Sequence, residues 1–502
     1  MPERAPLPER MRVRRGPATG AQPRPPSSKY YTLRYVLAAF LAEGESLVRA
    51  PAASDDTEVL VGAIRALGAR AEWVSEMETA AREATMPGVA RGGGAGSPVG
   101  ASNPRAALRV VGCGGRLRAP ASGVVNVGNA GAVLRLLLGL GALLPEVRFE
   151  TPYPLSLGRR PNADLLAALG ELGIACEAGE PGGLLPITLR GGPPRGGRVS
   201  ISGANSSQYL SALLYLAPLT TEGLRISVTD GLHSAPLVRA TLRALARAGV
   251  AVEAAPDLRG FVVAGGQRYR AGTHTVPGDG PSAAALVGAA VALGAPLRLE
   301  RLDRAEADVE ALLAALAGMG IPLTPNRGAG ARSSVGEQGY MPGVDTGAAA
   351  YASDVPALML APGARPHGAR IDGDACTDSV PALVALACFA DGESRFEGVA
   401  TLRLKESDRI GDLCAELGRA GCDLEAEADA IVVRGRPEGI VGGVTVAGHQ
   451  DHRLVQALAI AALHSREGLT ISDARHVAKS YPGFFADLAA MGAVVEAVED
   501  DG

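Results

Sequence analysis

Lysine is almost absent from this chain of 502 residues. Lysine and arginine together number 49, yet the sequence holds only three lysines, Lys29, Lys405 and Lys479. A composition biased toward arginine, alanine, glycine and proline explains why lysine is rare. It does not explain its positions, because all three lysines lie in short polar motifs. Since a compact ammonium group can be desolvated and can exchange a proton at usable pH, and a guanidinium group cannot, we predict that the three lysines serve the chemistry of the protein.

Other absences narrow the class of protein. The six cysteines form no Cys-x-x-Cys pair and have no histidine at metal-ligand spacing, so the sequence favours reduced thiols in the cytoplasm and no metal site. No apolar run approaches the length of a membrane span, no signal-peptide pattern opens the chain, and no nucleotide-binding fingerprint occurs. A net charge of -4 gives no general attraction to nucleic acid or anionic membranes. Any anion site must therefore be a local cluster of arginine and lysine.

The length and composition predict two domains of the α/β class. With 502 residues and a hydrophobic content of 47%, the chain can bury two sizeable cores. One unit recurs six times: an amphipathic helix, a glycine and a short apolar strand. Each glycine fits the left-handed position that follows a helix C-terminus. The helices are predicted at 57–67, 163–172, 239–248, 309–319, 410–420 and 484–491, followed by Gly68, Gly173, Gly249, Gly320, Gly421 and Gly492.

Six further helices are predicted, and each starts directly after a polar motif. The backbone N–H groups at a helix N-terminus favour anions, so these six starts are candidate ligand positions. The first 26 residues, rich in arginine and proline, are expected to form a flexible tail with a short strand near 11–13. The glycine-rich segments 90–103 and 326–347 are expected to be surface loops or insertions. The six helices are predicted at 33–42, 130–142, 207–216, 282–293, 380–389 and 451–463.

The segment 402–410 carries the densest group of charges at such a helix start. Lys405, Glu406 and Arg409 lie within five residues, where an apolar run gives way to a helical pattern. Cations beside an acid at a helix N-terminus suit an anionic ligand that exchanges protons. A solvated capping face is the alternative interpretation of the same charges.

Further motifs carry cations from both halves of the chain. Gly131 ends a glycine-rich turn that could bring backbone N–H groups close to a phosphate, although an ordinary capped helix fits too. The hydroxyls near 206 could serve only as a helix N-cap. His452 beside Arg453 is interpreted as a hydrogen-bonded structural residue. Because Asp378 and Glu406 are the acids best placed near these cations, the pattern predicts an interdomain cleft that binds two anionic molecules and moves protons.

The order and spacing of these motifs resemble the EPSP synthase family of enolpyruvyl transferases from residue 26 to residue 492. The matching pieces are Ser28-Lys29 with Arg34, Gly128 to Gly131 with Arg135, Arg160-Pro161, Ser206 to Gln208, Gly278-Asp279, Leu404 to Arg409, Asp451 to Arg453 and Ala478-Lys479. The resemblance implies a two-domain inside-out α/β barrel, with three βαβαββ units in each domain and two chain crossings. We expect a tail with the first strand at 1–26, a first domain at 27–275 and a second at 276–502.

The resemblance also implies the ligands and their residues. The substrates would be phosphoenolpyruvate and shikimate 3-phosphate, bound by a cytoplasmic monomer without cofactor, metal, nucleic acid or membrane. Phosphoenolpyruvate would contact Lys29, Gly131, Arg160, Arg409, Arg453 and Lys479. Shikimate 3-phosphate would contact Tyr30, Arg34, Ser206, Ser207, Gln208, Ser234, Asp378 and Lys405. Asp378 would take the proton of the acceptor hydroxyl with the help of Lys29, and Glu406 would protonate the methylene carbon of phosphoenolpyruvate.

Several positions depart from the family pattern and keep other functions open. Tyr30 stands where the family usually has serine, Leu237 where tyrosine is common, and Ala132 where threonine or serine is usual. A related enolpyruvyl transferase with another acceptor, or a non-catalytic anion-binding relative, are the alternatives. The absence of a cysteine near Arg160 disfavours the UDP-N-acetylglucosamine branch. Asp354 begins a near copy of the Asp378 motif, but it lies in a segment that the resemblance does not match.

Overall fold

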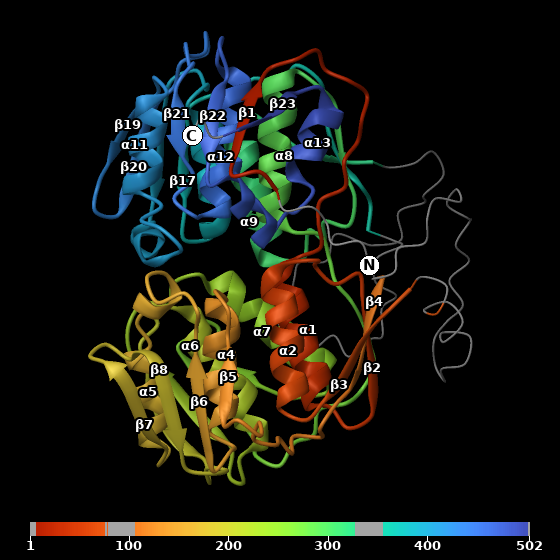
Figure 1. Cartoon of the computed structure of the whole chain (residues 1–502), viewed down its shortest axis with the longest axis vertical. Helices are drawn as coiled ribbons and strands as arrows, with labels where there is room; N and C mark the ends of the chain where they lie inside the picture. Colours follow the sequence, from red (N-terminus) through yellow and green to blue (C-terminus); the bar gives the residue numbers. More distant parts are fainter. Residues whose placement is uncertain (1–6, 76–77, 79–105, 327–354, 500–502) are drawn as a thin grey trace.

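The computed structural model describes residues 7–75, 78, 106–326 and 355–499, and divides into two halves stacked along the long axis (Figure 1). Six small sheets form the two halves. The sheets of the first half lie in the lower part of the view, and those of the second half in the upper part (Figure 1). The expected loops at 90–103 and 327–347, and Asp354, lie outside the described residues. No described helix is long and apolar enough to cross a membrane.

Three sheets build the first half. The first joins β13 (Thr273–Thr275), β2 (Glu45–Arg49), β4 (Ala107–Val111) and β3 (Arg70–Val74). The second joins β5 (Val124–Asn126), β6 (Glu146–Glu150), β8 (Leu184–Arg190) and β7 (Ala175–Glu180). The third joins β11 (Glu253–Ala254), β12 (Gly260–Val263), β10 (Leu224–Val228) and β9 (Gly197–Ile201).

Three more sheets build the second half. The first joins β14 (Leu297–Leu299), β16 (Leu358–Leu360) and β15 (Thr324–Pro325). The second joins β17 (Arg370–Asp372), β18 (Glu393–Glu397), β20 (Ala430–Arg434) and β19 (Asp423–Ala426). The third joins β21 (Thr445–Ala447), β22 (Leu469–Ser472), β1 (Arg10–Arg14) and β23 (Val494–Val498).

The four-stranded sheets share one pairing pattern, with a parallel pair at one edge and antiparallel pairs across the rest. This is the pattern of a βαβαββ unit, so the architecture that the resemblance implied is confirmed. Two of the sheets borrow a strand from far along the chain. β13 completes the sheet of β2, and β1 lies between β22 and β23 (Figure 1). The expected tail strand therefore exists, and it belongs to the last sheet of the second half.

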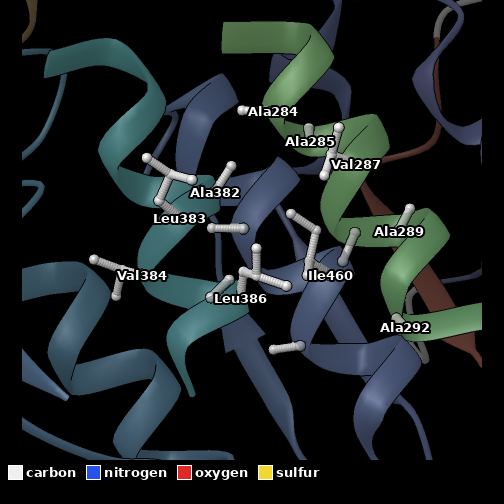
Figure 2. Close-up of a cluster of buried hydrophobic side chains, with 14 of the residues drawn as sticks. Ala284, Ala285, Val287, Ala289, Ala292, Ala382, Leu383, Val384, Leu386 and Ile460 are labelled. Carbon is white, nitrogen blue, oxygen red and sulfur yellow. The ribbon is translucent and has the colours of Figure 1, made fainter. Parts of the chain in front are cut away.

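Six inner helices are buried along almost their whole length, because apolar residues occupy most of their positions on every face. Alanine and glycine let the helices of the second half approach closely, and Figure 2 shows alanines such as Ala284 and Ala382 on helices that pack beside Ile460. A Cβ added to Gly288 would lie 2.8 Å from a methyl carbon of Ile460, an overpacking that would cost about 1–3 kcal/mol. The inner helices are α1 (Lys29–Leu41), α4 (Gly131–Gly141), α6 (Ser207–Leu216), α8 (Gly280–Leu293), α10 (Val380–Ala387) and α12 (His452–His464).

Six outer helices cover the sheets, and the glycine after each one has a positive φ, from 77° at Gly320 to 113° at Gly492. The predicted repeat of helix, glycine and strand is therefore confirmed, although the strands after Gly249 and Gly320 are only two residues long, at Glu253–Ala254 and Thr324–Pro325. The outer helices are α2 (Asp55–Ala66), α5 (Ala163–Glu171), α7 (Ala235–Arg247), α9 (Ala307–Gly318), α11 (Gly411–Arg419) and α13 (Phe484–Met491). Short 3-10 turns are η1 (Leu157–Arg159), η2 (Ala217–Leu219), η3 (Thr377–Ser379), η4 (Ala400–Leu404) and η5 (Ala474–Lys479).

The two crossings between the halves lie side by side. The N–H of Ser28 donates to the carbonyl of Pro277 over 2.8 Å, and the N–H of Asp279 donates to the carbonyl of Pro26 over 2.8 Å. One large apolar cluster lies between residues 31 and 276, and the other joins Met11 and Val13 to residues 283–493. The domain limits at 27, 275 and 276 stay a prediction. Because α1 and α8 begin directly after the crossings, their first residues lie where the halves meet.

Candidate active site

A pocket lies between the two halves, at the N-terminal ends of inner helices from both. The first half contributes Lys29, Tyr30, Asp56, Gly131, Ala132, Arg135, Arg160, Asn205, Ser206, Ser207, Gln208, His233, Ser234 and Leu237. The second half contributes Asp378, Thr401, Leu404, Lys405, Glu406, Arg409 and His452. The residues predicted for the site all line this pocket except Arg34, Arg453 and Lys479. The sequence motifs of the two halves are thus brought together at one place.

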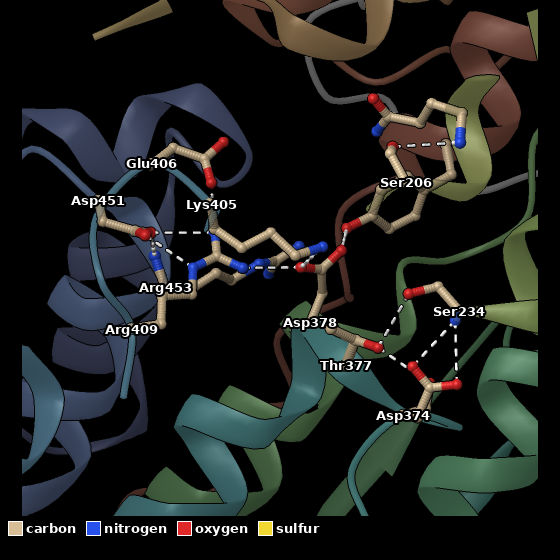
Figure 3. A network of polar contacts seen from close by, with 12 residues as sticks. Ser206, Ser234, Asp374, Thr377, Asp378, Lys405, Glu406, Arg409, Asp451 and Arg453 are labelled. Carbon is tan, nitrogen blue, oxygen red and sulfur yellow. Dashed lines mark hydrogen bonds and ion pairs between the residues drawn. The ribbon is translucent and has the colours of Figure 1, made fainter. Parts of the chain in front are cut away.

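Asp378, in η3 directly before α10, is held from both halves of the molecule. Arg409 Nη1 donates to its Oδ1 over 2.7 Å, and Lys405 Nζ lies 3.6 Å from the same oxygen (Figure 3). The hydroxyl of Tyr30, from the first half, donates to Oδ2. Burial raises the pKa of Asp378, but Lys405, Arg409 and Arg453 outweigh burial and hold that pKa well below its usual range. Asp378 is therefore an ionised carboxylate.

Arg409 is fully buried and joins three carboxylates. Its Nε donates to Asp451 Oδ2 over 2.7 Å, and its Nη2 donates to Asp451 Oδ1 over 3.1 Å (Figure 3). The same Nη2 donates to Glu406 Oε2 over 2.8 Å, while Nη1 serves Asp378. A guanidinium group in this position fixes the two predicted proton-transfer residues relative to each other.

Glu406 lies among cations from both halves. Its Oε1 is 3.1 Å from Lys479 Nζ and 3.5 Å from Arg160 Nη2. Burial raises the pKa of Glu406, but Lys479, Arg160 and Arg409 outweigh it and lower that pKa well below the usual range. Lys479 Nζ also donates to the carbonyl of Asn129 over 3.1 Å. Lys479 is therefore directly beside the pocket residue Glu406, although it does not itself line the pocket.

Lys29 and the residues around it complete the cationic side of the pocket. Lys29 Nζ pairs with Asp56 Oδ2 over 3.0 Å, and both side chains are buried. Burial lowers the pKa of His452 well below its usual value, and Arg453 and Lys29 lower it further, so this imidazole is neutral. Among the described residues the Nδ1 atom of His452 is buried without a hydrogen-bond partner, and the side chain lines the pocket, so its interpretation as a hydrogen-bonded structural residue stays a prediction.

The polar residues at the start of α6 face the pocket from the first half. Ser206 accepts from the N–H of Gln208 over 3.3 Å, so the predicted N-cap is present. Arg135 Nη1 donates to Gln208 Oε1 over 2.9 Å and to Ser206 Oγ over 3.4 Å. Ser207, the first residue of α6, lines the same wall. These residues present hydroxyl and amide groups on a rigid helix end.

Ser234 contacts the second half directly. Its N–H lies 3.0 Å from Asp374 Oδ1, and its hydroxyl lies 3.1 Å from the hydroxyl of Thr377 (Figure 3). The neighbouring His233 Nδ1 lies 3.1 Å from the same Asp374 oxygen. The wall of the pocket around Ser234 is therefore built jointly by the two halves.

Two predicted ligands lie beneath the pocket and bind protein groups. Arg34 Nη1 donates to the carbonyl of Tyr30 over 3.1 Å, and its Nη2 donates to the carbonyl of Leu237 over 2.9 Å. Arg453 Nη2 lies 3.3 Å from Asp279 Oδ2. Both arginines are buried, with exposed fractions of 4% and 2%. Arg34 holds the backbone of the pocket residues Tyr30 and Leu237, and the direct contact of both arginines with substrate stays a prediction.

Sequence reasoning missed several acids that position the cations. Asp56, Asp279 and Asp451 pair with Lys29, Arg453 and Arg409 respectively. Asp279 and Asp451 also cap α8 and α12, which is the role that a sequence pattern suggests for an acid before a helix. Because the sequence predicts many cations in one cleft, it also signals that buried cations there need acidic partners. Within the described residues no cluster of histidine, cysteine, aspartate or glutamate has the geometry of a metal site.

Comparison with known proteins identifies the family. Residues 17–91 and 98–488 match the EPSP synthase (3-phosphoshikimate 1-carboxyvinyltransferase) family. The 3-phosphoshikimate 1-carboxyvinyltransferase of Deinococcus radiodurans is 40% identical over 472 residues, which cover 94% of this chain and 93% of that protein. The protein of the same name from Halorubrum lacusprofundi is 33% identical over 488 residues, covering 94% of this chain and 96% of that protein.

Solved structures agree on the fold. An EPSP synthase from Acinetobacter baumannii superposes with a TM-score of 0.73 at 23% identity, covering 97% of this chain and 99% of that chain. The enolpyruvyl transferase NikO from Streptomyces tendae gives a TM-score of 0.69 at 18% identity, covering 98% and 99% of the two chains. The sequence matches span nearly the whole chain and include the motifs that converge on the pocket. The chain therefore belongs to the EPSP synthase (3-phosphoshikimate 1-carboxyvinyltransferase) family.

Proposed function

We propose that the protein transfers the enolpyruvyl group of phosphoenolpyruvate to the 5-hydroxyl of shikimate 3-phosphate and releases phosphate. The observation that carries this proposal is the pair of ionised carboxylates, Asp378 and Glu406, held on one buried guanidinium in an interdomain pocket. One carboxylate can accept the proton of a hydroxyl while the other lies among cations that suit a phosphate. The names of the relatives supply the acceptor, 3-phosphoshikimate, and the transferred carboxyvinyl (enolpyruvyl) group.

We assign phosphoenolpyruvate to the cations that surround Glu406. Arg160, Arg409 and Lys479 lie within 3.5 Å of its carboxylate oxygens. Lys29 lines the same pocket, and the N-terminus of α4 at Gly131 adds backbone N–H groups, which favour a phosphate. Arg453 acts from beneath, since its charge helps to lower the pKa of Asp378.

We assign shikimate 3-phosphate to the wall formed by both halves. Ser206, Ser207 and Gln208 present polar groups at the start of α6, and Lys405 faces them from the second half. Ser234 lies at the junction with Asp374 and Thr377, where its hydroxyl can exchange a protein partner for a phosphate oxygen. Tyr30 lines this part of the pocket, and Arg34 supports it from below.

The base of the reaction is Asp378, which takes the proton of the 5-hydroxyl with Lys29 assisting as that oxygen attacks C2 of phosphoenolpyruvate. The lowered pKa of Asp378 keeps it ionised at neutral pH, because Lys405, Arg409 and Arg453 stabilise the carboxylate. A general base that is correctly placed accounts for about 10²- to 10⁴-fold of a rate. The electrostatic stabilisation of both anionic substrates by the surrounding cations contributes in addition.

The acid is Glu406, and substrate binding prepares it. In the structure, Lys479, Arg160 and Arg409 keep its carboxylate ionised. When phosphoenolpyruvate brings its own negative charges to these cations, the charges raise the pKa of Glu406, so that the carboxylate takes up a proton from solvent and becomes a proton donor. It protonates the methylene carbon to form the tetrahedral adduct. Cleavage of the bond between C2 and the phosphate oxygen then releases phosphate, which takes up the proton held by Asp378. The methyl group returns one proton to a carboxylate, and the double bond is restored.

The test measures phosphate release from phosphoenolpyruvate with and without shikimate 3-phosphate. We expect release only when shikimate 3-phosphate is present, together with formation of the enolpyruvyl ether. Release with a different acceptor alone would favour a related enolpyruvyl transferase, the alternative that Tyr30 and Leu237 suggest. Binding of both ligands without any release would favour a non-catalytic relative. We further propose that the protein acts in the cytoplasm as a monomer without nucleic-acid or membrane partners, and light scattering after size-exclusion chromatography tests the monomer.

A further inference from the structure

Tyr30 belongs to the first half, but its hydroxyl group binds the proposed base of the second half. It is the second residue of α1, and the hydroxyl donates to Asp378 Oδ2. Arg409 and Lys405, both from the second half, approach the other oxygen, Oδ1. The two oxygens of the base are therefore held by different halves of the molecule.

The backbone of Tyr30 is fixed firmly enough to aim its side chain. Arg34, one turn later in α1, donates to the carbonyl of Tyr30 over 3.1 Å and to the carbonyl of Leu237 in α7 over 2.9 Å. Its Nε donates to Thr241 Oγ1 over 2.8 Å. A buried guanidinium thus ties the first turn of α1 to α7, and the ring of Tyr30 projects from this support into the pocket. A group that orients a catalytic side chain needs this kind of rigid support.

The chemistry of the phenol suits a permanent donor. Burial raises the pKa of Tyr30 well above its usual value, and the neighbouring Asp378 raises it further, so the hydroxyl keeps its proton. A carboxylate oxygen can accept two hydrogen bonds, so Oδ2 can hold the phenol and still accept the acceptor hydroxyl. A hydrogen bond to the charged form of a carboxylate stabilises that form.

We propose that Tyr30 is a positioning residue for the reaction and that its hydroxyl orients the carboxylate of Asp378. The base then has its reactive orientation only when the two halves are together. The inference rests on the proposed function, since it needs Asp378 to be the base. It assigns to Tyr30 an action on the enzyme's own carboxylate, which is distinct from the contact with substrate that the family resemblance implies. It also gives a role to the bulky tyrosine that stands where a small residue is usual, since its hydroxyl reaches Asp378 of the second half.

The test is Tyr30→Phe, which removes the hydroxyl and keeps the ring. We expect kcat to fall by roughly 10- to 100-fold, the loss typical of one hydrogen bond to a charged group, with the KM values for both substrates nearly unchanged. We also expect the acidic limb of the kcat–pH profile to move to higher pH, because the pKa of Asp378 rises when the hydrogen bond is lost. Tyr31→Phe is the matched control: the next ring in α1 packs 5.6 Å from the ring of Tyr35, and this variant should keep the wild-type kcat and profile. Thermal unfolding verifies that both variants fold.

Three results would overturn the proposal. An unchanged kcat and pH profile in Tyr30→Phe would show that the hydroxyl does not act on the base. A higher KM for the acceptor at constant kcat would make Tyr30 a substrate ligand. A lower kcat without movement of the acidic limb would place its action elsewhere. If the wild type releases no phosphate with shikimate 3-phosphate, the proposed function fails instead. The pKa of Asp378 in wild type and Tyr30→Phe, measured by NMR of ¹³C-labelled aspartate, then still decides whether the hydroxyl controls that carboxylate.

Discussion

The backbone N–H of Ser234 in the first half lies 3.0 Å from a carboxylate oxygen of Asp374 in the second. His233 contacts the same oxygen from the same half, and the hydroxyl of Thr377 reaches that of Ser234. These contacts join the two halves where His233 and Ser234 line the pocket. They can therefore form only when the halves are closed, so we call Ser234, Asp374 and Thr377 the rim contact.

The rim contact leads to a prediction about closure. Asp374→Ala should weaken the closed form and raise the KM for shikimate 3-phosphate several-fold, because the acceptor must then stabilise closure alone. Small-angle scattering should show compaction of the wild type on addition of shikimate 3-phosphate and less compaction of the variant at the same ligand concentration. Asp391→Ala, which removes an exposed carboxylate of the same half, is the control and should behave as the wild type. Equal compaction of Asp374→Ala and wild type would contradict a role of Asp374 in closure.

Asp378 should be indispensable for turnover but not for binding of phosphoenolpyruvate. Asp378→Ala removes the proposed base, so kcat should fall by about 10²- to 10⁴-fold while phosphoenolpyruvate still binds, as isothermal calorimetry can measure. Asp354→Ala changes the near copy of the motif and should leave turnover almost unaffected. A reversed pair of phenotypes would show that the sequence motif had been assigned to the wrong aspartate.

The rarity of lysine leads to a third prediction. The ammonium group of Lys479 lies 3.1 Å from both the carbonyl of Asn129 and the carboxylate of Glu406. Lys479→Arg should fold but lose about 2–3 kcal/mol of transition-state binding, measured as kcat/KM, because a planar guanidinium cannot keep both contacts. Lys405→Arg should be impaired for a similar reason, since Lys405 helps to hold Asp378.

A matched control for the lysines lies in the same turn. Arg475, also in η5, is largely exposed and pairs with Glu9 over 3.0 Å. Arg475→Lys should leave kcat/KM unchanged, since ion pairs on the surface contribute little to stability. Near-normal kcat/KM in both Lys479→Arg and Lys405→Arg would mean that the lysines occupy these motifs by chance.

The sequence predicts the repeating architecture well because its signals are local. Each of the six glycines that end a helix must adopt a backbone that other residues avoid, so positions such as Gly68 and Gly421 mark their helices directly. The limits of α6 agree with the prediction residue for residue. α1 begins four residues earlier than the apolar pattern predicts, because Ser28 caps it and the polar residues Lys29 and Tyr30 are already helical.

The sequence does not predict which strands pair when they are far apart along the chain. Nothing in residues 10–14 indicates that they lie between β22 and β23, more than 450 residues later. The residue types of the site were predicted, but their partners were not. The resemblance implies that Arg34 and Arg453 are substrate ligands, whereas the structure pairs them with carbonyl groups and a carboxylate. A charged motif predicts that a charged side chain is needed at that position. Only the fold decides which protein groups pair with that side chain.

The turn at Gly131 permits a final prediction. A Cβ at this position would lie 2.8 Å from Arg160 Nη1, so Gly131→Ala must push the guanidinium of Arg160 away from Glu406 and the phosphoenolpyruvate site. The KM for phosphoenolpyruvate should rise by roughly tenfold, the weakening of one charge-assisted contact, while the KM for shikimate 3-phosphate changes little.

Gly170→Ala is the control for the added methyl group. Gly170 lies within α5, and no atom is within 4 Å of the position that its Cβ would take. That variant should keep both KM values and should raise the free energy of unfolding by about 0.5–1 kcal/mol, because alanine favours a helix interior over glycine. If Gly131→Ala behaves in the same way as Gly170→Ala, then Arg160 can move without consequence, and it is not a close ligand of phosphoenolpyruvate. An increase in the KM for phosphoenolpyruvate confined to Gly131→Ala would instead place the substrate between the start of α4 and Arg160.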